Sequence, residues 1–231
     1  MRTIQIADKT VAYELKYTKT LGIRMMYRPE NDPPFIVHAN RFTGKLFLES
    51  FLRKNAAWIL SCLNKPKEAG FYLLGKKRDV RLEKGAKNTW NETDGIIVFT
   101  VKDPKDDETL EKLVKKVWKA YLEEYVESRR ALYEQITGKK NVVFSYRAMH
   151  TEYGSCHPKS GRITLNLQLA CLPSAYIDAI VFHEYAHFKV LNHSEAFYRV
   201  LEGYYPAYRK IRREMRNVSF KNPVKCVRES I

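Results

Sequence analysis

A pair of histidines four residues apart constrains this chain more than any other feature. His183 and His187 enclose Glu184 in the pattern H-E-x-x-H. Residues at this spacing share one face of an α-helix, so a helix here brings both imidazoles to the same point. The flanking residues are mostly apolar, and burying two histidines and a glutamate among them would be costly without a metal ion. The pattern therefore predicts a metal-binding helix.

The third ligand of such a site is predicted to follow the helix. Zinc in catalytic sites has three protein ligands and one open position, and His193 lies six residues beyond His187. On a continuing helix it would point about 120° away from the shared face, so the chain must turn back first. Asn192 suits this turn because asparagine tolerates the left-handed conformation that often ends a helix. A more distant carboxylate, Glu195 or Glu202, is the alternative ligand.

The predicted chemistry is hydrolysis. Glu184 lies next to the predicted ion, where a carboxylate can take a proton from metal-bound water, and is therefore the candidate catalytic base. The first expectation is a zinc-dependent peptidase acting on a peptide or a protein. The same water could instead attack phosphorus, which would make the chain a nucleoside triphosphate pyrophosphohydrolase. The third alternative is a nucleic-acid-associated protein with a structural zinc, although a structural site needs no base beside its ligands.

The charge balance favours an anionic partner. Lysine and arginine total 41 against 26 acidic residues, which gives a formal net charge of +15. Such a charge would attract nucleic acid or nucleotides. The basic residues gather at 76–78 and 209–216, and the tail adds Lys221, Lys225 and Arg228. A solvated surface is the alternative interpretation, and no motif typical of sequence-specific nucleic-acid binding is present.

Several protein classes are excluded by composition. Residues 1–10 have no apolar core of signal-peptide length, and the apolar runs elsewhere are too short to span a bilayer. The cysteines form neither a disulfide scaffold nor a cysteine-rich zinc motif, because four of them lie far apart: Cys62, Cys156, Cys171 and Cys226. We expect unpaired thiols in a reducing, cytoplasmic environment. The oligomeric state is not indicated.

The periodicity of apolar residues predicts an α+β fold in two parts. Residues 1–101 are rich in short strands, and residues 102–231 are mainly helical, although the two parts can also form one continuous domain. Near the N-terminus, alternating segments at 11–15 and 23–27 flank a turn at 19–22 and predict a β-hairpin.

Helices are predicted from the spacing of apolar residues, and Gly138 is predicted to end the longest of them. They cover residues 45–64, 106–136, 174 to 190 or 191, 194–203 and 206–216. Short strands at 142–146 and 163–165 are expected to contribute to a small, strongly twisted sheet over the H-E-x-x-H helix.

A set of residues across 147–209 matches the pattern of one protein family. In chain order they are Arg147, Gly154-Ser155-Cys156, Leu165-Asn166, Pro173, the H-E-x-A-H pattern, Asn192-His193-Ser194 and Phe197. The segment resembles the YgjP-like metallopeptidase family, which is related to the SprT and WLM metalloproteases. The resemblance implies a zincin-like fold, a zinc ion held by His183, His187 and His193, and Glu184 as the base. Three departures concern substrate preference rather than metal binding: Glu152, Tyr153 and Tyr185.

Substrate binding is predicted beside the metal. Tyr153, Gly154 and Ser155 are expected on an edge strand that could pair with an extended peptide, and glycine permits a close backbone approach. Arg147 is a candidate for binding a substrate carboxylate or phosphate, with a structural ion pair as the alternative. Cys156 is expected to pack beneath the helix, since a fourth protein ligand would close the site. Three tyrosines are candidates to line the cleft: Tyr204, Tyr205 and Tyr208.

Overall fold

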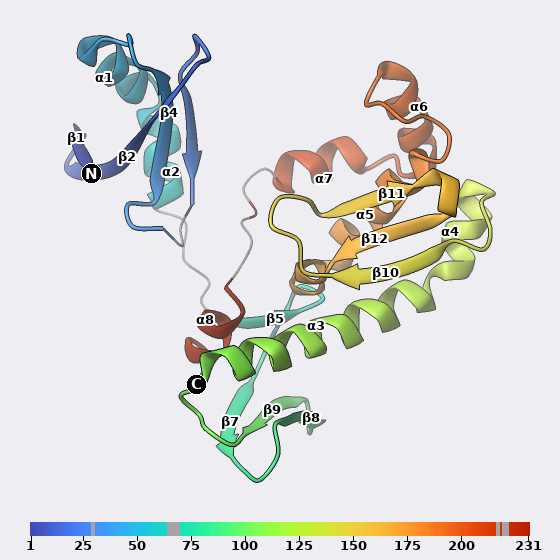
Figure 1. The fold of residues 1–231 in the computed structure, drawn as a ribbon. Helices are drawn as coiled ribbons and strands as arrows, with labels where there is room; N and C mark the ends of the chain where they lie inside the picture. Colours follow the sequence, from blue (N-terminus) through green and yellow to red (C-terminus); the bar gives the residue numbers. More distant parts are fainter. Residues whose placement is uncertain (29–30, 64–69, 216–217, 219–221) are drawn as a thin grey trace. The chain divides into compact units, whose positions relative to one another are not determined.

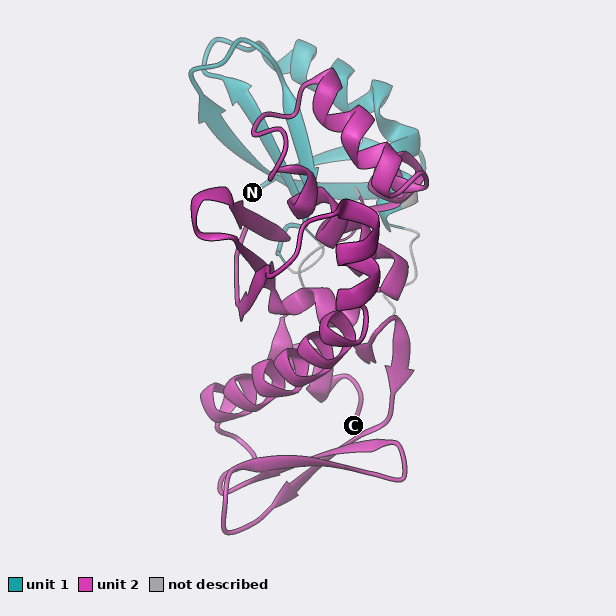
Figure 2. Cartoon of the chain, turned by 90° about the vertical axis from the view of Figure 1, so that its right-hand side faces the viewer, with its two compact units in different colours: residues 1–68 teal, residues 69–231 magenta. Residues whose placement is uncertain are grey.

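Helices and small sheets alternate along the chain in the computed structural model (Figure 1), so the predicted α+β class is confirmed. The structure describes residues 1–28, 31–63, 70–215, 218 and 222–231. It divides into two compact units, residues 1–68 and residues 69–231, which Figure 2 shows in different colours.

The first unit contains a four-stranded sheet. The sheet has the order β1-β2-β4-β3, with β1 (Arg2–Ile6), β2 (Lys9–Thr18), β4 (Phe35–Asn40) and β3 (Arg24–Tyr27). The predicted hairpin is wrong, because β4 lies between β2 and β3, parallel to the first and antiparallel to the second. β4 carries buried side chains on both faces, and such a strand takes a central place in a sheet. Turn residues show where the chain reverses, but they do not show which two strands pair in the sheet.

The helix predicted at 45–64 is two helices. α1 (Lys45–Lys54) and α2 (Ala56–Leu63) are separated by Asn55. The side-chain amide of Asn55 donates to the carbonyl of Phe51 at 2.8 Å, and such local side-chain bonds compete with a regular helix. Residue 64, the predicted last position, lies outside the described residues.

The second unit begins with short strands around a long helix. They form a hairpin and a three-stranded sheet of order β7-β9-β8: β5 (Phe71–Leu73), β6 (Lys76–Arg78), β7 (Val80–Lys84), β8 (Thr89–Thr93) and β9 (Ile96–Val101). The buried side chains of β5 and β9 share one hydrophobic core with those of α3 (Asp107–Ser128). The two units therefore divide between residues 68 and 69, not near the predicted residue 101. Alternation identifies a strand, but it does not identify the helix that covers it.

The long helix predicted at 106–136 is interrupted. α3 and α4 (Arg130–Thr137) are separated at Arg129, whose backbone angles are φ −105° and ψ 0°. The Asp106 side chain caps α3 by accepting from the Thr109 amide at 3.0 Å. Gly138 ends α4 in the left-handed conformation with φ 70°, as predicted.

A second three-stranded sheet covers the helix that carries His183 and Glu184 (Figure 1). Its central strand β12 (Arg162–Asn166) pairs in parallel with β10 (Val143–Arg147) and antiparallel with β11 (Gly154–His157). β11 is therefore an edge strand, as predicted. α5 (Ser174–Ala186) packs against β11 and β12. The remaining helices of the unit are η1 (Pro158–Ser160), η2 (Leu167–Cys171), α6 (Glu195–Tyr204), α7 (Tyr208–Met215) and α8 (Pro223–Arg228).

The cysteines form no disulfide bonds. Three of the four cysteines are buried, and Cys156 is half-buried. None of the described helices combines the length and the apolar character that crossing a membrane requires.

Candidate metal centre

Helix α5 ends at Ala186 with His187 as its C-cap, before the residue 190 or 191 that the apolar pattern predicts. The amides of Phe188 and Lys189 bond carbonyls three residues back, at 3.1 and 3.0 Å, which tightens the last turn. The chain then reverses and brings His193 back to the helix. The predicted left-handed turn at Asn192 is wrong, because Asn192 does not adopt a positive φ.

Three histidine side chains converge beside the end of α5. Ring nitrogens of His183, His187 and His193 all lie within 4.8 Å of one another. Nε2 of His183 is 3.0 Å from Nε2 of His193. A tetrahedral ion with Zn–N bonds of about 2.0–2.1 Å holds its donors roughly 3.3 Å apart. The observed spacing therefore fits three nitrogen ligands around one ion.

The residues predicted as alternative ligands lie outside this cluster. Glu202 forms an ion pair with Arg209, and Glu195 is exposed in the first turn of α6. Burial, followed by the charge of Glu184, raises the pKa of the Cys156 thiol to about 12, which disfavours the thiolate that binds metals. Among the described residues, the candidate ligand set is therefore the three histidines.

Both helical histidines have a hydrogen-bond partner at Nδ1. Nδ1 of His183 lies 2.8 Å from the hydroxyl of Tyr208, and Nδ1 of His187 lies 3.1 Å from the carbonyl of Val190. A carbonyl can only accept, so Nδ1 of His187 carries the proton and Nε2 keeps its lone pair. Burial, reinforced by the neighbouring histidines, lowers the pKa of His183 to about 3. His183 is therefore neutral near pH 7, as a metal ligand must be.

Phe197 supports the cluster from α6. Its ring centroid lies 4.9 Å from that of His183, 4.6 Å from that of His187 and 4.9 Å from that of His193. The side chain is fully buried, so it limits the movement of all three imidazoles. In the sequence, Phe197 is one aromatic of a family pattern. Its supporting role depends on α6 folding back, which no local pattern shows.

The candidate base is buried against strand β11. Glu184 is 5% exposed, and burial, with a smaller contribution from the charge of Glu152, raises its pKa to about 8. A Cβ atom at Gly154 would lie 2.9 Å from Oε1 of Glu184 and 3.1 Å from its Cγ and Cδ. The strand can approach the carboxylate this closely because residue 154 has no side chain.

We expect Gly154→Ala to lower kcat by about 10- to 100-fold, because the added methyl group displaces the carboxylate of Glu184. Zinc content and the melting temperature measure whether the rest of the site survives. The matched control is Gly203→Ala, since no heavy atom lies within 4 Å of a Cβ built there. Equal kcat values for the two variants would contradict the prediction.

A cavity of about 620 Å³ opens beside the histidines. Its lining includes Tyr153, Gly154 and Ser155 of the predicted substrate-binding set. Arg147 is exposed at the end of β10 and is not part of this lining. The other lining residues are Thr151, Glu152, Cys156, Pro158, Ile180, His183, Glu184, His187, Leu191, His193, Tyr208, Arg212 and Met215. Tyr208 is thus the one of the three predicted tyrosines that lines the described cavity. The substrate-binding roles stay predictions.

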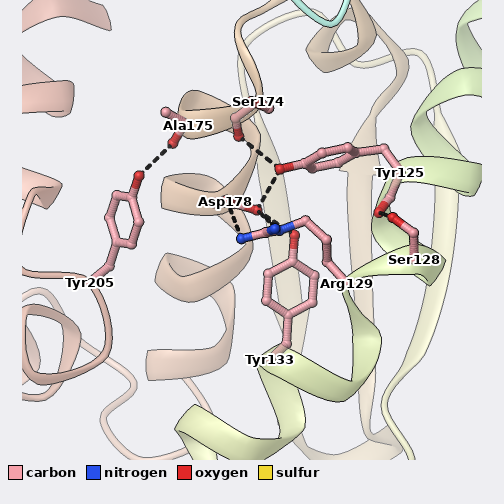
Figure 3. A network of polar contacts seen from close by, with 8 residues as sticks. All are labelled: Tyr125, Ser128, Arg129, Tyr133, Ser174, Ala175, Asp178 and Tyr205. Atoms are coloured by element: carbon pink, nitrogen blue, oxygen red, sulfur yellow. Dashed lines mark hydrogen bonds and ion pairs between the residues drawn. The ribbon is translucent and has the colours of Figure 1, made fainter.

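A polar network anchors α5 to the two helices packed beside it (Figure 3). The buried carboxylate of Asp178 accepts from the hydroxyl of Tyr133 at 2.6 Å and from that of Tyr125 at 3.0 Å. It also pairs with Arg129, at 3.0 Å from both Nε and Nη2. The ring of Tyr133 packs edge-on against Phe182, with centroids 5.3 Å apart. The interruption at Arg129, which the periodicity does not reveal, thus lies at the contact that holds the histidine helix.

In the metal-free protein, Glu184 makes stability depend on pH. The unfolded chain releases the proton of Glu184 near its ordinary pKa of 4.5, whereas the folded protein keeps it up to the raised pKa of about 8. The stabilisation that this proton gives is therefore full below pH 4.5 and is lost as pH rises through about 8. Glu184→Gln removes this titration. From pH 4.5 to 8 we expect the free energy of unfolding of the variant to gain on that of the wild type, by on the order of a few kcal/mol. Urea unfolding in a chelator measures this difference, and a constant difference across the range would contradict the prediction.

The predicted basic surface is partly neutralised. Ion pairs involve Arg78 with Glu92, Lys225 with Glu229, and Arg228 with Asp107. Arg216 and Lys221 lie outside the described residues. These contacts give no support to a nucleic-acid partner, which stays a prediction.

Comparisons with known proteins point to one family. A family model described as YgjP-like, metallopeptidase domain, matches residues 23–218. Curated protein sequences give no match. A solved structure, the metallopeptidase zymogen of Pyrococcus abyssi abylysin, is 27% identical over 40% of this chain and 94% of that chain, with a TM-score of 0.37. This TM-score is too low for the likeness to carry an argument about the fold.

Proposed function

Because the chain belongs to the YgjP-like family of metallopeptidase domains and is therefore a metal-dependent hydrolase, we propose that it is a zinc peptidase of zincin-like architecture. The proposed ligands are His183, His187 and His193, and the proposed base is Glu184. The observation that carries the proposal is the convergence of three imidazoles beside a buried glutamate at an open cavity.

The donor set suits zinc. Three neutral imidazole nitrogens are common ligands of catalytic zinc, and the cavity leaves room for a fourth, exchangeable position. The hydrogen bond between Nδ1 of His183 and the Tyr208 hydroxyl, and the one that Nδ1 of His187 donates to the Val190 carbonyl, would hold the two rings in a ligand orientation. When bound, zinc would polarise the scissile carbonyl and lower the pKa of a coordinated water.

The protein side chains supply the proton transfers and the alignment. In its deprotonated form Glu184 accepts a proton from the attacking water and returns it to the leaving amine. One edge of β11 pairs with no described strand and offers backbone groups to an extended peptide, and Gly154 lies on this strand next to the base. The substrate is thereby aligned along the edge of the sheet with its carbonyl near the three histidines.

The test is activity profiling of the zinc-loaded protein, with the chelated protein as control. The substrates are peptides, unfolded proteins with and without DNA, and nucleoside triphosphates. We expect peptide or protein cleavage that is lost on chelation and restored by zinc. Hydrolysis of nucleoside triphosphates without any peptide cleavage would overturn the peptidase proposal and leave the metal site standing.

A further inference from the structure

One cation of the cavity wall is not used by the proposed chemistry. Arg212 lies on α7, one turn beyond Tyr208, and lines the cavity that contains the histidines. Its guanidinium carbon is 5.3 Å from the ring centroid of Tyr198, a cation–π contact that limits its movement. Arg212 is exposed on the cavity side of the protein, so its charge is available to a ligand.

The charge of Arg212 has no acidic partner among the described residues. α6 and α7 carry three acidic groups, and none of them forms an ion pair with Arg212: Glu202 pairs with Arg209, Glu214 accepts from the hydroxyl of Tyr176 at 3.1 Å, and Glu195 is exposed at the start of α6. Arginine binds carboxylates bidentately and stacks on aromatic faces, so an arginine that lies over Tyr198 beside the three histidines, without a described carboxylate partner, is suited to receive its anion from the ligand.

The cavity lining also contains a negatively charged residue, Glu152, at some distance along the chain from Arg212. Glu152 precedes β11 and acts electrostatically on Glu184, whereas Arg212 on α7 acts on His183. A negatively charged substrate group is therefore attracted toward α7 and repelled from the start of β11. This polarity would fix the orientation of a peptide lying along the strand.

We infer that Arg212 is a specificity-determining residue that binds a carboxylate of the peptide substrate, supplied by an acidic side chain or by the C-terminus. The inference rests on the proposed peptidase function. A guanidinium binds a carboxylate through two parallel hydrogen bonds, which adds orientation to charge. The substrate class is thus peptides with a carboxylate close to the scissile bond.

The experiment compares matched peptides that carry aspartate or asparagine at successive positions on either side of the scissile bond. A second pair carries a free or an amidated C-terminus, which separates the two sources of carboxylate. For at least one pair we expect kcat/KM of the wild type to favour the carboxylate by about tenfold or more. Arg212→Gln should bring that ratio close to one. Arg212→Glu should invert the preference, so that a peptide with lysine at the same position is cleaved better than the aspartate peptide.

The matched control is Arg213→Gln, since Arg213 is the adjacent exposed arginine and does not line the cavity. It should keep the wild-type ratio. Each ratio is taken within one variant, so partial loss of metal or of folded protein cancels. Peptide affinity of the zinc-loaded Glu184→Gln protein, with and without Arg212→Gln, gives a readout that does not need turnover.

The two proposals fail in different ways. If the wild type cleaves peptides but Arg212→Gln leaves every ratio and every affinity difference unchanged, the inference is overturned and the peptidase function stands. If the zinc-loaded wild type cleaves no peptide and hydrolyses nucleoside triphosphates, both proposals are overturned.

Discussion

Glu184→Gln is expected to lower kcat for peptide hydrolysis by about 10²- to 10⁴-fold while zinc content stays at the wild-type level. The amide has nearly the shape of the carboxylate but cannot accept a proton from water. Glu184 is buried against Gly154, so the substitution changes its chemistry without opening space. Steady-state kinetics and metal analysis on the same preparation test both halves of the prediction.

The matched control for this variant is Glu195→Gln. Glu195 is exposed at the start of α6, close in sequence to His193, and is one of the alternative ligands considered from the sequence. We expect it to retain both turnover and zinc. Unchanged turnover in Glu184→Gln would assign the base to another residue, and loss of zinc in Glu195→Gln would restore the carboxylate as a ligand.

Asp178→Ala is expected to lower the free energy of unfolding by about 3 kcal/mol. The substitution removes the acceptor for Tyr133, whose hydroxyl is buried, and leaves Arg129 without its partner. Since a buried unpaired group loses its interactions with both protein and water, the cost exceeds that of one hydrogen bond. Chemical unfolding of the metal-free protein measures the effect without a contribution from bound zinc.

Two further variants calibrate the Asp178 prediction. Tyr133→Phe removes one hydrogen bond to a charged acceptor and should cost about 1.5–3 kcal/mol. Lys112→Ala breaks an exposed ion pair with Glu108 and should leave the free energy of unfolding nearly unchanged, because water screens such a pair. If Asp178→Ala costs no more than Lys112→Ala, the network does not anchor helix α5.

The convergence of the candidate ligands could be predicted because it depends on local spacing. His183 and His187 meet through the geometry of one helix, and a chain reversal over a few residues brings in His193. The edge position of β11 could also be predicted from the sequence, because Gly154 and Ser155 belong to a short segment among turn residues. The way in which the chain reverses after α5 could not be predicted. The last turn of the helix tightens, and Asn192 does not adopt the predicted left-handed conformation.

Contacts between distant segments could not be predicted from one sequence. The pairing of β2 with β4 depends on which apolar strand is buried on both faces. Tyr208 reaches His183 across 25 residues, and Arg129 reaches Asp178 across 49. No periodicity of the chain links such positions, so their roles emerge once the helices are packed.

By itself the sequence determined the α+β class, the family and the candidate site of three histidines with a glutamate. These follow from short-range periods and motifs, which act within one helix or one turn. The tertiary structure decided the strand order, the division between the units, the support of the histidines by Phe197 and the place of Arg212 in the cavity. These depend on which surfaces bury each other, a property of the whole chain rather than of any segment.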